Sequence, residues 1–167
     1  MSDDTDDGYA RTPDGIFTAP LRMFYPYERT PGPTYSRFLD GLAGGRLEGT
    51  RAPDGTVYVP PAEFDPRSGT PLEDWVALGD EGEVVSWSWQ AEPAPNHPLQ
   101  GPFAWALVRP DGADTSMLVA VDAGEPAAMH CGLRVRVRLV EGAEPAMGIR
   151  AVACFEPVGA EGSGERS

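Results

Sequence analysis

The sequence predicts a mainly β protein in which a short N-terminal helix and a hairpin precede a five-stranded barrel. Glycine and proline are frequent, with 20 and 18 copies in 167 residues. This composition favours short strands and many turns over long helices. In addition, five strand-like segments follow one another after residue 80, and no helical pattern of useful length separates them.

Each of the five segments is bounded by turn-forming residues. The fourth, LRVRVRLV, alternates strictly, with apolar side chains on one face and Arg134, Arg136 and Arg138 on the other. RPDGAD joins the second and third as a hairpin turn. Five antiparallel strands with long first and fourth connections predict a small Greek-key barrel, the OB-fold, over residues 75–158. The predicted strands are 83–90, 103–109, 116–122, 133–140 and 148–157.

Residues 21–45 predict an aromatic arm followed by a helix. Apolar side chains recur at helical spacing, with Thr34 as a candidate N-cap and Gly44-Gly45 as a stop. The arm, MFYPY, is extended because proline disfavours a helix before it. Its aromatic side chains either fold back onto the barrel or face a partner, and the sequence leaves both open. The residues concerned are Phe24, Tyr25 and Tyr27 in the arm, and Tyr35, Phe38, Leu39 and Leu42 in the helix.

Residues 46–74, called the ribbon segment below, have the frame of a zinc ribbon without its cysteines. Arg51, Asp54, Asp65 and Ser68 stand about where the four ligands would be. Such hard and mostly weak ligands do not hold zinc in the ribbon manner. We therefore expect no metal and no cofactor. An ion pair such as Arg51 with Asp65 would partly replace the metal. Packing by the apolar side chains would contribute more, and these are Val57, Val59, Phe64 and Trp75.

The charge and the cysteines of the sequence indicate which partners and which cellular location to expect. The formal charge of −13 opposes binding to a phosphate backbone, so nucleic acid is not an expected partner. Cys131 and Cys154 are expected to be buried, reduced thiols. Residues 1–20 and 159–167 read as disordered. No apolar stretch has the length of a membrane span or signal peptide, so the expected location is the cytoplasm.

No catalytic motif occurs in the sequence. His97 and His130 lack a nucleophile-plus-base signature, and both are expected to be loop or turn residues. Trp87 and Trp89 share a strand face, and Trp105 is expected to join them across the neighbouring strand in the core. The arginine row is either a solvated face or a surface for an acidic partner or acyl-CoA phosphates.

With these residues in view, the chain resembles the acyl-CoA-associated OB-fold family, domain of unknown function 35 (DUF35), over residues 20–158. The motifs that carry the resemblance are FYPYERTPGPTYSRFLDGL, DGTVYVPPAEFDPRSGTPLEDWV, GDEGEVVSWSW, FAWALVRPDGAD and HCGLRVRVRLVEG. The first two of these motifs are most similar to the branch of that family that lacks the ribbon cysteines, as this chain does. The resemblance implies a non-catalytic subunit, inactive alone, of a thiolase-like aldolase in steroid side-chain degradation, assembled as a two-plus-two heterotetramer.

That aldolase cleaves a 17-hydroxy steroid C22-acyl-CoA to a 17-ketosteroid and propionyl-CoA. The partner would hold the acid/base residues. This chain would contribute an apolar interface built from the arm and the helix, that is from Phe24, Tyr25, Tyr27, Tyr35, Phe38 and Leu42. The alternatives are an independent acyl-CoA-processing enzyme, an acyl-CoA-binding module and, against the charge, a nucleic-acid-binding OB-fold.

Overall fold

The computed structural model describes residues 10–18, 30–140 and 149–159, and the chain divides into two compact units, Met1–Thr30 and Pro31–Ser167. In the first unit, β1 (Ala10–Arg11) pairs antiparallel with β2 (Phe17–Thr18). Thr12 closes the turn, because its Oγ1 donates to the carbonyl of Ile16 and accepts from its N–H, both at 3.1 Å. This hairpin lies within the range for which the sequence predicted disorder.

The second unit begins with the single α-helix of the described residues, α1 (Gly32–Ala43). The helix ends at the predicted stop, because Gly45 adopts a positive φ of 77° and its N–H bonds the carbonyl of Leu42. Its start differs from the prediction: Pro31 is the N-cap and Thr34 lies inside the first turn without capping it. None of the described helices combines the length and apolar character that crossing a bilayer requires.

The ribbon segment forms a three-stranded sheet in the order β4-β3-β5. Its strands are β3 (Glu48–Arg51), β4 (Val57–Tyr58) and β5 (Asp74–Ala77). The N–H of Gly55 closes the turn between β3 and β4 by donating to the carbonyl of Ala52 at 2.9 Å. Gly55 has a φ of 92°, which this turn requires. Because β5 pairs with β3, the predicted domain boundary at residue 74/75 falls inside a strand of this sheet.

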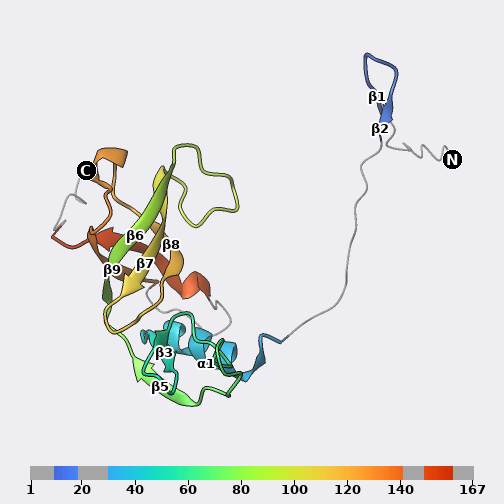
Figure 1. Cartoon of the computed structure of the whole chain (residues 1–167). Helices are drawn as coiled ribbons and strands as arrows, with labels where there is room; N and C mark the ends of the chain where they lie inside the picture. The colour runs from blue at the N-terminus through green and yellow to red at the C-terminus, as the bar shows by residue number, and fades with distance from the viewer. Residues whose placement is uncertain (1–9, 19–29, 141–148, 160–167) are drawn as a thin grey trace. The chain divides into compact units, whose positions relative to one another are not determined.

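The remaining strands close into a five-stranded barrel in the order β10-β8-β7-β6-β9. In Figure 1 the labelled strands β6, β7, β8 and β9 lie together in this barrel. A short 3-10 turn, η1 (Pro126–Ala128), precedes β9. All five predicted strands are confirmed, but the expectation of a wholly antiparallel barrel is wrong. Closure brings β10 beside β8 in parallel, with Phe155 opposite Val121. The bounds are β6 (Glu81–Gln90), β7 (Phe103–Pro110), β8 (Met117–Val121), β9 (Arg134–Leu139) and β10 (Val152–Pro157).

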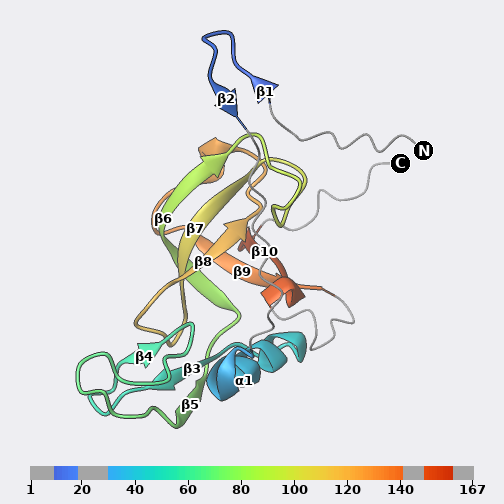
Figure 2. The same ribbon diagram turned by 90° about the vertical axis from the view of Figure 1, so that its right-hand side faces the viewer.

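The hydrophobic core joins the barrel to α1 and the start of the ribbon segment. Figure 2 shows α1 and the three-stranded sheet at one end of the barrel. Phe38 and Leu42 of α1 are each 2% exposed and belong to the same cluster as Val84, Met117 and Phe155 of the barrel. Full burial of such a side chain contributes about 1.5–3 kcal/mol. The helix is therefore part of the core.

The tryptophans divide between the two faces of the barrel wall. Trp87 and Trp89 lie opposite Ala106 and Ala104 and pack on the core, as predicted. Trp105 lies opposite Ser88 and therefore points to the other face, so the expectation that it joins them is wrong.

Candidate functional site

The second turn of the ribbon segment is organised around the carboxylate of Asp65, which is 7% exposed. Its Oδ2 accepts a 2.5 Å hydrogen bond from Ser68 Oγ, and its Oδ1 accepts one of 3.1 Å from the N–H of Arg67. The hydrogen bond from Ser68 is the main cause that lowers the pKa of Asp65, and the one from Arg67 adds to it. Asp65 and Ser68, two of the positions at which the sequence analysis expected ribbon ligands, therefore hydrogen-bond each other directly.

A second connection runs between the two turns. Arg67 Nη1 lies 2.6 Å from Asp54 Oδ2, and the N–H of Thr56 donates to Asp54 at 2.9 Å. The hydrogen bond from Thr56 is the main cause that lowers the pKa of Asp54. The expected pair of Arg51 with Asp65 does not form, because Arg51 lies on β3 facing Asp74 of β5, at 3.5 Å.

Apolar packing holds the ribbon segment only in part as predicted. Val57 and Val59 are buried, and Trp75 carries the guanidinium of Arg37 at 4.1 Å from its ring centroid. Phe64 differs from the prediction, since it is 50% exposed. Across the described ranges, no group of three or more His, Cys, Asp or Glu side chains is placed to hold a metal ion.

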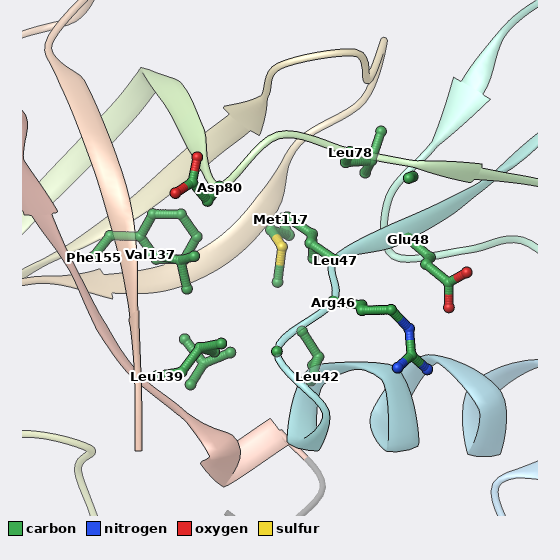
Figure 3. Close-up of a pocket in the computed structure, with 13 residues that line it drawn as sticks. Leu42, Arg46, Leu47, Glu48, Leu78, Asp80, Met117, Val137, Leu139 and Phe155 are labelled. Carbon is green, nitrogen blue, oxygen red and sulfur yellow. The ribbon is translucent and has the colours of Figure 1, made fainter. Parts of the chain in front are cut away.

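A cavity of about 220 Å³ lies at the junction of α1, the ribbon segment and the barrel. In Figure 3, Leu42 rises from the helix while Val137, Leu139 and Phe155 come from the barrel. The lining is apolar except for Arg46, Glu48 and Asp80. Acids and a base thus share this cavity.

A larger groove of about 510 Å³ lies against the barrel wall near the loop that joins β6 to β7. Its lining is mostly apolar and includes Trp105 of β7 and Leu118 of β8. The polar side chains lining it are Asn96, His97, Arg150 and Cys154. None of the described residues that line the groove is acidic. No local sequence pattern identifies the groove, because its residues come mainly from the β6–β7 loop, β7, β8 and the region of β10.

The two histidines lie in different surroundings. His97 packs edge-on against Phe103 and Trp105, at 5.7 and 5.9 Å between ring centroids. Its Nδ1 accepts from the N–H of Ala94 at 3.2 Å, which ties the loop to itself. His130 is exposed in the turn before β9. Both are loop or turn residues, as predicted.

The arginine row on β9 is neutralised by acids of its own chain. Arg134 lies 2.5 Å from Asp111, Arg136 pairs with Glu81, and Arg138 lies 2.9 Å from Glu156. The hydrogen bonds of Arg136 and then Arg134 lower the pKa of Glu81. The solvated-face interpretation therefore fits the row better than a surface reserved for phosphates.

The two cysteines differ from each other. Cys154 is buried, as predicted, and burial raises the pKa of its thiol even though Arg138 Nη2 lies 3.1 Å away. Cys131 is exposed, so the expectation of two buried thiols is wrong for this residue, which occupies the turn before β9.

The predicted partner-binding residues fall into three groups. Tyr35 is 44% exposed on α1. Phe38 and Leu42 lie in this chain's own core, because the apolar face of α1 packs on the barrel, and so they are removed from any exposed surface. Phe24, Tyr25 and Tyr27 lie outside the described residues.

The closed barrel with a parallel β8–β10 pair is that of an OB-fold protein. Residues 75–140 match the model of the ChsH2 C-terminal OB-fold domain. No curated protein matches the sequence.

Solved structures that share the fold include two DUF35 proteins. A chain of the "Ltp2-ChsH2(DUF35) aldolase" has a TM-score of 0.59 and 22% identity, covering 78% of this chain and 98% of that one. A DUF35 protein of unknown function from Sulfolobus solfataricus has a TM-score of 0.52 and 20% identity, covering 64% and 78%. The predicted resemblance to DUF35 is confirmed.

Proposed function

We propose that this chain is the OB-fold subunit of a heteromeric thiolase-like aldolase. The observation that carries the proposal is that this chain matches 98% of a chain of the "Ltp2-ChsH2(DUF35) aldolase". The match of residues 75–140 to the ChsH2 C-terminal OB-fold domain supports it. The arrangement of the histidines also supports a non-catalytic role, since His97 is held in a packed loop and His130 is in an exposed turn.

The proposed reaction is the retro-aldol cleavage of a 17-hydroxy steroid C22-acyl-CoA. One carbon–carbon bond breaks, a proton leaves the hydroxyl group, and a proton is delivered to the enolate carbon. The products are a 17-ketosteroid and propionyl-CoA, and no oxidant is required. Acid/base residues are needed, and we assign them to the partner. This chain would stabilise the partner or complete its substrate site.

The proposed assembly contains two copies of each subunit and uses the apolar arm together with Tyr35. Light scattering after size exclusion should give the mass of a two-plus-two complex with a co-expressed thiolase-like partner. Tyr35→Ala, Phe24→Ala and Tyr27→Ala should weaken it, whereas Val158→Ala, which alters another exposed apolar side chain, should not. Separate elution of the two proteins at micromolar concentration would contradict the proposal.

A further inference from the structure

Two arginines have no ion-pair partner among the described residues, and each lines a cavity. Of the nine arginines with described side chains, seven pair with an acid. The other two are Arg46, at the junction cavity, and Arg150, at the barrel groove. In a chain of net charge −13, a cation left without a counterion beside a concave surface is unusual.

The two cavities differ in how they would receive a negative charge. Arg46 shares its cavity with Glu48 and Asp80, whose carboxylates repel an anion. Among the residues that the structure describes, none of those lining the groove that holds Arg150 is acidic. Of the two cavities, the groove therefore combines an arginine that has no ion-pair partner with a lining whose described residues include no acid.

The shape and lining of the groove are those of a small-molecule site. Its volume of about 510 Å³ falls within the range of about 300–1,000 Å³ typical of ligand pockets. Leu118 and Ile149, two apolar side chains of the groove, are 63% and 53% exposed. Covering them with an apolar body would remove that area from water.

We propose that the groove binds an amphipathic anion, with an aliphatic or alicyclic body against Trp105 and Leu118 and one anionic group at Arg150. A guanidinium pairs with a carboxylate through two parallel N–H donors, which fixes the orientation of the ligand as well as its charge. The proposal concerns this chain alone and does not require a partner subunit.

The test uses the full chain and decanoate, followed by calorimetry and by tryptophan fluorescence. Decanoate should bind saturably, once per chain, and more tightly than the neutral 1-decanol. Arg150→Gln should weaken decanoate binding about fivefold, as for an exposed ion pair, and leave decanol unchanged. Arg46→Gln makes the same change at the junction cavity and should have no effect. Trp105→Phe should remove the fluorescence change while the calorimetric signal remains.

A variant that fills the groove gives a second, independent check. Ala153→Phe should block both ligands, and a near-ultraviolet circular dichroism spectrum like that of the parent chain would show that the fold is kept. The proposal is overturned if decanoate does not saturate, if decanol binds as tightly, or if Arg46→Gln weakens binding as much as Arg150→Gln. Loss of partner assembly in the groove variants without any decanoate binding would identify a protein interface and overturn it too. Failure to form the aldolase complex would leave this test unaffected.

Discussion

Ser68 Oγ donates a 2.5 Å hydrogen bond to Asp65 Oδ2, within the turn where a zinc ribbon would present two cysteines. Arg67 of the same turn reaches Asp54 of the first turn at 2.6 Å. A hydrogen bond thus closes the second turn of the ribbon segment, and an ion pair connects it to the first turn.

Stability of the ribbon segment should accordingly be independent of metal. We expect Asp65→Ala to lower the unfolding midpoint more than Asp54→Ala does, because Asp65 is buried and Asp54 is exposed. EDTA should leave the midpoint of the parent chain unchanged. Thermal unfolding followed by near-ultraviolet circular dichroism measures all three. A drop of several degrees on chelation would contradict the metal-free account.

The acids facing the arginine row should make stability depend on pH. The pKa of Glu81 lies below its ordinary value of 4.5 in the folded chain, because Arg136 and Arg134 donate to it. The unfolded chain therefore binds the proton more readily. The contribution of Glu81 is present above about pH 4.5 and is lost as the pH falls through the folded value.

Glu81→Gln isolates this contribution. The variant should be less stable than the parent chain at neutral pH, and the difference should shrink as the pH is lowered and as salt is added. Glu63→Gln removes the same charge from an exposed residue with no ion pair among the described residues, and should show neither trend. Denaturant titrations between about pH 3 and pH 7 give the comparison. A difference that stays constant across that interval would refute the assignment.

His97 should act as an anchor for the loop between β6 and β7. His97→Ala removes two edge-on ring contacts, each worth about 0.5–1.5 kcal/mol, and should expose the loop amides to hydrogen exchange. His130→Ala is the matched control and should change neither exchange nor stability. Both variants should support full turnover in a complex with the partner. A turnover defect confined to His97→Ala, with normal exchange in the loop, would instead indicate a catalytic role.

The two aromatic residues of α1 should behave oppositely. Phe38→Ala opens a cavity in the joint core and should cost about 3–5 kcal/mol of unfolding free energy. Tyr35→Ala should cost little stability and should weaken partner binding. Denaturant unfolding combined with a titration against the partner separates the two effects. Equal losses of stability in both variants would show that Tyr35 is a core residue.

The barrel was predictable because its strands carry local signals. The alternation in LRVRVRLV and the RPDGAD turn depend only on neighbouring residues, so β9 and the β7–β8 hairpin follow from them. Pairings between distant strands have no such signal. The parallel β8–β10 pair is imposed by closure of the barrel. Likewise, the register shift between Val84 and Ser86 sets Trp105 opposite Ser88.

The functional surfaces were harder to predict than the fold. The spacing of Phe38 and Leu42 identified the apolar face of α1, but spacing does not say whether that face meets a partner or the chain's own barrel. Arg150 has no local feature that separates it from the paired arginines, since the acids that pair with the others are distant in sequence.

The most direct test of the central claim is an assay of propionyl-CoA release from a 17-hydroxy steroid C22-acyl-CoA. The assay compares the thiolase-like partner alone, this chain alone, and the co-purified complex. We predict turnover by the complex, none by this chain alone, and little or none by the partner alone. Turnover by this chain without the partner, or full turnover by the partner without this chain, would contradict the account.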